Sequence, residues 1–387
     1  MKFRKIFLMC LSVYAALGIS SVSPSVFAEE NETAEKPLTI ETSPNIEIDQ
    51  AKVDAFISRA RDVIQTEKHE QMKSRTLANT SDEIINYNFV DDDNISYFYE
   101  SNKDEDYLFV TEVPIEDISP DQDINPNKDS ILGNEQHEFA PTAVGNLPDG
   151  IGGKATVVSS TGGVLSTLIT TATESQMNVP ANITAYIYAG FTGGKSTSST
   201  SAVEADLGLQ YSTAYGRAKW KPAYLFYFNG HNDPINYPAD SKMDFNQLYN
   251  QVQYQNGFVP GTNVTQWVYR NYSDANVTNA VRLKQSGTAI CADMNCSKPT
   301  PTQMISILEI AKRNVTSINS FKLLATLCDY KVNGSLVTPA SGAIYAKFSS
   351  IKVDDVAVNP STTTVEDRAK VTISGNSATI DVNSSKY

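Results

Sequence analysis

Short runs of alternating apolar and polar residues fill the chain from residue 148 to residue 387. They are rich in β-branched and aromatic residues, and Gly, Ser, Thr and Pro separate one run from the next. This pattern is typical of antiparallel strands in a sandwich. It predicts a mainly β protein whose residues 148–387 form a jelly-roll-like antiparallel β-sandwich.

One stretch of this region has a different period. Met304, Ile305, Leu308 and Ala311 recur at the spacing of one helical face. We therefore expect a short helix over residues 302–312, inserted among the strands of the sandwich.

The part before the sandwich has a helical pattern followed by strand-like patterns. Apolar residues fall on one helical face over residues 48–72. Three strand-like runs follow at residues 84–90, 95–100 and 107–113, separated by turn-forming polar residues. Residues 47–115 are therefore predicted to form a small α+β module, a helix followed by a three-stranded meander.

The segments on either side of this module are acidic and have no periodicity. We expect residues 29–46 to be a disordered N-terminus and residues 116–147 to be a linker. Residues 29–150 carry 29 acidic and 9 basic residues, whereas residues 151–387 carry 15 and 19. Because a nucleic acid needs a basic surface for its phosphates, we expect no nucleic-acid partner.

The N-terminus has the three parts of a secretory signal peptide, which we assign to residues 1–28. Lys2, Arg4 and Lys5 precede an apolar run, and a small-residue cleavage site ends at Ala28. The apolar run is shorter than the roughly 20 residues of a membrane span, and no second long run follows it. We predict cleavage after Ala28, secretion to the extracellular space and no transmembrane anchor.

Glu204 and Asp206 are the most suggestive pair of acids. Residues two apart on a strand point to the same side of a sheet, so the two carboxylates should lie together. Retaining glycosidases use such a pair at about 5 Å. The alternative is structural: a polar sheet face, or buried acids bonded to neighbouring backbone or to Arg217.

Aromatic residues on the predicted strands are candidates for binding a ligand. Trp220 and Tyr224 share one side of their strand, and Trp267 lies on a later one. Sugars stack on such rings, with a few polar groups to fix their orientation. The alternative is that these rings fill the inward face of the sandwich.

The acidic linker offers candidates for a calcium site, and no other cofactor is predicted. Oxygen-bearing side chains occupy every second position, in the rhythm of an EF-hand loop. Pro126 stands where that loop needs Gly, and Leu132 where it needs a bidentate acid, so a solvated linker is the alternative. The candidate ligands are Asp121, Asp123, Asn125, Asn127 and Asp129.

Three cysteines remain after the predicted cleavage: Cys291, Cys296 and Cys328. Export permits disulfides, and the odd number leaves one thiol over. The sequence does not choose the pairing. A zinc site is the rival interpretation, but it needs a fourth ligand, and no histidine is near these residues in sequence.

Two sets of motifs resemble known families. The Glu204-Ala-Asp206 strand is similar to the Glu-x-Asp strand of jelly-roll β-glucanases related to concanavalin A. Their further acid/base Glu would fall at Gly208 or Leu209, so the proton donor is missing here. Leu147-Pro-Asp-Gly-Ile-Gly-Gly153, Glu204-Ala-Asp-Leu-Gly208 and Trp220-Lys-Pro222 resemble the YrpD-type secreted proteins of bacilli. This second resemblance covers roughly residues 147–358 and implies a Gram-positive exported protein without an established activity.

These features favour a secreted, non-catalytic β-sandwich protein that binds carbohydrate or another cell-surface polymer, such as the cell wall. Two alternatives remain open. One is a glycoside hydrolase that cleaves polysaccharide with Glu204 and Asp206. The other is an exported structural or assembly protein whose N-terminal module is a pro-region.

Overall fold

The computed structural model describes residues 36–387, with gaps. The predicted signal peptide, its cleavage site and most of the acidic linker lie outside the described residues. The longer gaps are 75–82, 118–149, 195–201, 214–216, 230–239, 246–255, 292–301 and 337–340, and the remaining gaps are one or two residues long.

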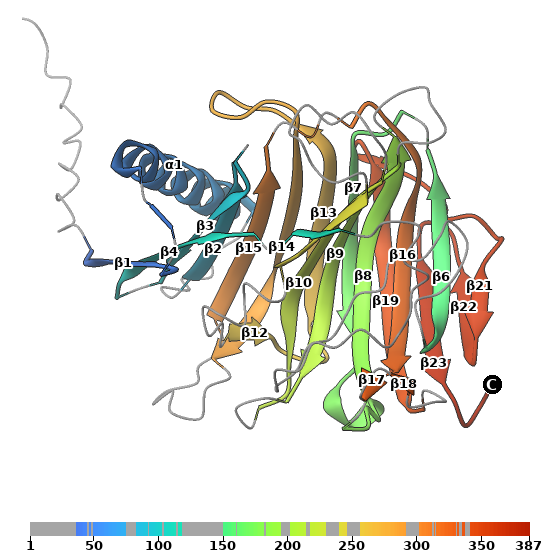
Figure 1. Ribbon diagram of the computed structural model, residues 1–387. Coiled ribbons are helices and arrows are strands. Elements are labelled where there is room, and N and C mark those ends of the chain that lie inside the picture. The colour runs from blue at the N-terminus through green and yellow to red at the C-terminus, as the bar shows by residue number, and fades with distance from the viewer. Residues whose placement is uncertain are drawn as a thin grey trace, which may run out of the picture. The chain divides into compact units, whose positions relative to one another are not determined.

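The strands form two layers, as Figure 1 shows. The strands of the first layer, in spatial order, are β1 (Leu38–Thr42), β4 (Asp106–Glu112), β3 (Ile95–Ser101), β2 (Glu83–Val90), β15 (Thr302–Ile310), β14 (Ala280–Cys291), β13 (Asn263–Tyr272), β7 (Val164–Thr171), β19 (Ala343–Val353), β23 (Ala378–Asn383) and β22 (Ala369–Ile373). Those of the second layer are β5 (Ile115–Asp117), β11 (Asp240–Asp244), β10 (Lys219–Asn229), β9 (Ala202–Ser212), β8 (Ile183–Gly194), β16 (Ser317–Asp329), β6 (Gly150–Val158) and β21 (Val365–Asp367).

The short strand β12 (Asn256–Phe258) joins the layers because it pairs with both β10 and β14. Among the described strands, every pairing is antiparallel except β1 with β4 and β15 with β2. The other short elements are η1 (Glu174–Gln176), β17 (Lys331–Val332), β18 (Ser335–Leu336) and β20 (Val356–Ala357). The prediction of a mainly β sandwich with a small α+β part is confirmed.

Alternation along the strands builds the main core between the layers. Ile187 of β8, Leu207 of β9 and Leu323 of β16 point inward from the second layer, and Val268 and Leu283 from the first. All five are fully buried. Burial of this apolar surface is the main force that holds the layers together.

The prediction of a helix over residues 302–312 is wrong, because residues 302–310 form strand β15 in the middle of the first layer. Met304 and Leu308 face the main core, whereas Ile305 and Ile307 face a second apolar cluster on the other side. A strand buried on both faces has apolar residues at nearly every position. A helical period can be picked out of such a run although none is present.

Helix α1 (Gln50–Ser74) and strands β2 to β4 lie within residues 47–115, and β1, which pairs with β4, lies in the segment 29–46 that was expected to be disordered. One face of α1, including Phe56, Ala60 and Ile64, packs on Ile305 and Ile307 of β15 and on β2 and β3. Figure 1 shows α1 at the end of the sheet formed by these strands. Residues Pro37–Tyr387 form one compact unit, so the module continues the sheet of the sandwich. No described helix is long and apolar enough to cross a membrane.

Candidate functional site

The outer side of the second layer carries most of the candidate chemistry, and we call it the polar face. It is opposite the main core, because side chains alternate between the two sides of each strand. Each member has less than a tenth of its surface exposed. The polar face consists of Lys154 from β6, Thr184, Tyr186, Tyr188 and Thr192 from β8, Glu204 and Asp206 from β9, and Lys322, Thr326 and Cys328 from β16.

An ion cluster lies at the centre of this face. The Lys322 Nζ atom is 3.0 Å from Oε2 of Glu204 and 2.9 Å from Oδ1 of Asp206. The Thr192 hydroxyl also donates a hydrogen bond to Glu204 Oε1, at 3.3 Å. Strand periodicity correctly placed the two carboxylates side by side, but it could not supply the lysine, which comes from β16.

Gly190 makes this cluster possible. Strand β8 lies between β16 and β9, and Gly190 is in register with Lys322 on one side and with Asp206 on the other. A Cβ atom at position 190 would lie 2.3 Å from Asp206 Oδ1 and 2.4 Å from the Ala205 carbonyl oxygen. The lysine and the aspartate therefore meet across an intervening strand that has no side chain at this point.

Burial and charge alter the proton affinities of the cluster. Burial raises the pKa of Asp206 to about 6, against the opposing charge of Lys322, and the nearby Glu204 charge adds to the rise. Burial alone would lower the pKa of Lys322, but Asp206 and Glu204 raise it above its usual value. Burial, with the charge of Lys322, lowers the pKa of Lys154. The cluster therefore contains one carboxyl group that exchanges its proton close to neutral pH.

Two tyrosines stand beside the ion cluster and were not among the sequence candidates. Tyr186 and Tyr188 pack with Leu225, Leu324 and Cys328 in a small apolar cluster. Burial, and then the Asp206 charge, raises the pKa of Tyr188. Their alternation in the sequence was visible, but the side of the sheet they occupy follows only from the register of β8 with β9 and β16.

The aromatic residues that the sequence predicted to bind a ligand do not lie on the polar face. Trp220 and Tyr224 are completely buried in the main core, so neither ring offers a surface to a ligand, which corrects that expectation. The Tyr224 hydroxyl donates a hydrogen bond to Ser306 Oγ at 2.6 Å. Trp267 is partly exposed on the outer side of the first layer, with the Lys284 Nζ atom 4.9 Å from its ring centre. It remains a predicted ligand-binding residue.

The other candidates mostly lie outside the described residues. All five predicted calcium ligands, Asp121 to Asp129, fall in such a gap, as does Cys296. Cys291 ends strand β14, and its side chain is not described. Cys328 is buried on the polar face, with Sγ 3.6 Å from Thr326 Oγ1.

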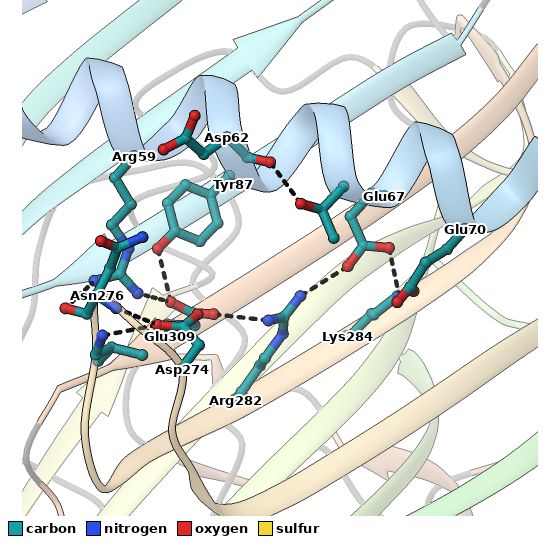
Figure 2. Close-up of polar contacts among 12 residues, drawn as sticks. Arg59, Asp62, Glu67, Glu70, Tyr87, Asp274, Asn276, Arg282, Lys284 and Glu309 are labelled. Carbon is teal, nitrogen blue, oxygen red and sulfur yellow. Dashed lines mark hydrogen bonds and ion pairs between the residues drawn. The ribbon is translucent and has the colours of Figure 1, made fainter.

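A second charged cluster joins α1 to the first layer (Figure 2), and we call it the seam cluster. At its centre is Glu309 of β15, which is completely buried. It accepts a hydrogen bond from the Tyr87 hydroxyl at 2.7 Å and pairs with Arg59 of α1 and, at 3.2 Å, with Arg282 of β14. Sequence reasoning missed it, although an acid within an apolar run is the signal to look for.

The seam cluster continues along α1 through Glu67. Its carboxylate is 2.7 Å from Arg282 and 2.5 Å from Lys284, while Glu70 lies 3.7 Å from Lys284. Figure 2 shows these acids on the helix, reaching towards basic residues of the sheet. Charges that pair in this way offset much of the free energy lost when they leave water.

The fold and the polar face define a β-sandwich protein that carries an additional α+β module. A family model described as "Domain of unknown function, YrpD" matches residues 144–382, more than half of the chain. The chain belongs to this YrpD family, as its motifs predicted. It is 34% identical over 242 residues to "Uncharacterized protein YrpD" of Bacillus subtilis (strain 168), a match that covers 62% of this chain and 84% of that protein.

Solved structures show weaker likeness. A scytalido-glutamic peptidase bound to a peptide-based transition-state analogue matches with a TM-score of 0.32 and 14% identity, over 60% of this chain and 97% of its own. SCP-B, a member of the Eqolisin family of peptidases in complex with the tripeptide Ala-Ile-His, matches with a TM-score of 0.30 and 12% identity over the same shares. These scores are too low to transfer an activity.

Proposed function

We propose that this chain is an exported protein that binds a hydroxyl-rich polymer, a carbohydrate of the cell surface or cell wall, at the polar face. One observation carries the proposal: two carboxylates, two lysines and two tyrosines share one side of a sheet whose other side is apolar core. Tyr186 and Tyr188 are 1% and 3% exposed, so they support the face from below, and the carboxylates and lysines are the fixed polar groups that a polymer hydroxyl would contact. The signal-like N-terminus supports export.

The ion cluster supports the proposal through its rigidity. Lys322 holds both carboxylates in place, so the acceptor oxygens are oriented before a ligand arrives. Preorganised groups lose less entropy on binding than mobile ones. Glu204 is 8% exposed and Asp206 is 5% exposed, so direct contact with a polymer is limited to the edges of the two carboxylates.

A hydrolase that cleaves polysaccharide is the second candidate, and the same carboxylates favour it. Because one ammonium nitrogen contacts both, their bonded oxygens are at most about 6 Å apart, near the spacing used by retaining glycosidases. Asp206, with a pKa of about 6, has the proton affinity of a general acid. The absence of a further acid at Gly208 and Leu209 still counts against it.

The test is retention of the full chain on insoluble polysaccharides and cell-wall sacculi, with released sugar measured in the supernatant. We expect retention without release. Asp206→Asn should weaken it about tenfold or more, the worth of one charge-assisted hydrogen bond. Asp355→Asn is the matched control, because Asp355 is exposed and its φ of 63° suits Asn.

Two results would change the conclusion. Sugar release that Glu204→Gln abolishes would establish the hydrolase. No retention on any polymer, or equal retention of the Asp206→Asn and wild-type chains, would refute the polar face as a polymer site.

A further inference from the structure

Lys154 differs from the other charged groups of the polar face, because it forms no ion pair with a described residue. It lies on β6 opposite Leu324 of β16, which makes it the diagonal neighbour of Lys322 on the same side of the sheet. Lys322 pairs with both Glu204 and Asp206. The ion cluster therefore contains one lysine that contacts both acids, and beside it a second lysine that contacts neither.

The strand on the other side of β6 supplies no acid to Lys154 either. On β21, Val365 lies opposite Lys154, and Asp367, two residues further on, shares that side of the strand. Asp367 pairs with Arg368 instead, with 3.3 Å between its Oδ1 atom and the guanidinium Nε atom. Lys154 thus has an apolar side chain on each flank, Leu324 and Val365, and no direct contact with an acid offsets the burial of its amine.

These surroundings favour the neutral form of Lys154. Burial, and then the charge of Lys322, lowers the pKa of Lys154, and the charges of Glu204 and Asp206 oppose this only in part. The pKa of Lys322 moves in the other direction, because both acids contact it, so Lys322 remains the cation of the two. A lysine that is desolvated beside a second cation has the setting of a nucleophilic amine.

A small molecule can approach Lys154 along β6. Thr156 and Val158 follow Lys154 on the same side of the strand. Lys154 is 9% exposed, Thr156 is partly exposed and Val158 is 77% exposed, so access increases towards this end of the strand. The small exposed fraction of Lys154 limits its partner to a small molecule or to the end of a longer chain.

We infer that Lys154 is a nucleophilic amine that binds aldehydes covalently at the polar face, by forming an imine. The Nζ lone pair attacks the carbonyl carbon, and the carbonyl oxygen leaves with both hydrogens of the amine as water. A carbon–nitrogen double bond replaces the carbon–oxygen double bond, so the step needs neither an oxidant nor a reductant. The open-chain end of a reducing sugar belongs to this class of ligand, but the inference does not depend on the proposed polymer binding.

The test is reductive trapping on the folded wild-type chain. Glycolaldehyde and cyanoborohydride at pH 7 convert an imine into a stable secondary amine, and peptide mass spectrometry follows each lysine. Lys347 and Lys370, which are exposed and form no ion pair among the described residues, are internal controls. We expect Lys154 to be modified several-fold faster than either. This advantage should disappear as the pH rises towards about 10, where exposed amines lose their protons too.

Asp206→Asn separates this inference from polymer binding. It removes an anion that favours the protonated form of Lys154, so it should speed the modification of Lys154 several-fold while it weakens retention on the polymer. Asp355→Asn is the matched control and should change neither. Modification of Lys154 that is slower than that of Lys347 and Lys370 at pH 7, or that Asp206→Asn does not speed, would overturn the inference. Either result can occur with polymer retention intact, so the two proposals can fail separately.

Discussion

At the scale of single residues, Asp206 links stability to pH. Its pKa in the fold, about 6, is above the ordinary value of 3.8. The protonated form is therefore favoured by folding. Its stabilising contribution is complete below about pH 4 and disappears as the pH rises through 6. Asp206→Asn removes this dependence, so the variant should gain stability relative to wild type between pH 4 and 7, by up to about 3 kcal/mol.

Urea unfolding of both chains at several pH values measures this difference. The Asp355→Asn chain serves as control and should track wild type throughout. A difference between Asp206→Asn and wild type that stays constant, or that falls as the pH rises, would contradict the raised pKa of Asp206.

The residues of the polar face also show where sequence reasoning ends. The two-residue period of a strand places Glu204 and Asp206 on the same side of the sheet. Lys322 joins them only because Gly190 leaves a gap in the strand between. No local pattern reports which strand becomes the neighbour, so the cation and the two tyrosines could not be assigned.

At the scale of elements, β15 shows why an apolar run can be misread. Ile307 and Leu308 are both completely buried but face different clusters. A helix would place Ile307 and Leu308 on the same face as Met304, because positions i, i+3 and i+4 lie together, whereas the strand places Ile307 and Leu308 on opposite sides of the sheet. In the strand, Ile307→Ala and Leu308→Ala should each destabilise the fold by about 2–5 kcal/mol.

Chemical unfolding of the two variants tests this two-sided burial. Gln303→Ala, at a partly exposed position of the same strand, is the control and should cost less than about 1 kcal/mol. A cost below that value for Ile307→Ala would mean that this face of β15 is not covered by α1.

At the scale of the whole molecule, the module and the sandwich share one sheet and should unfold together. Circular dichroism and tryptophan fluorescence follow the two parts separately. Helix α1 is the one long helix among the described residues, so it dominates the helical circular dichroism. Both tryptophans, Trp220 and Trp267, lie in strands of the sandwich and report on it by fluorescence. We expect the two unfolding transitions to coincide, because α1 and β15 bury each other's apolar side chains.

Glu67→Gln sharpens this last test, because Glu67 is the acid on α1 that pairs with both Arg282 and Lys284. The neutral amide leaves two buried cations with less compensation, so the fold should lose about 3 kcal/mol. Both signals should shift to lower denaturant by the same amount, whereas Glu105→Gln, at an exposed position of the module, should shift neither. A helical signal that disappears first, with tryptophan fluorescence unchanged, would contradict this expectation, because it would mean that the module unfolds while the sandwich stays folded with the edge of β15 exposed.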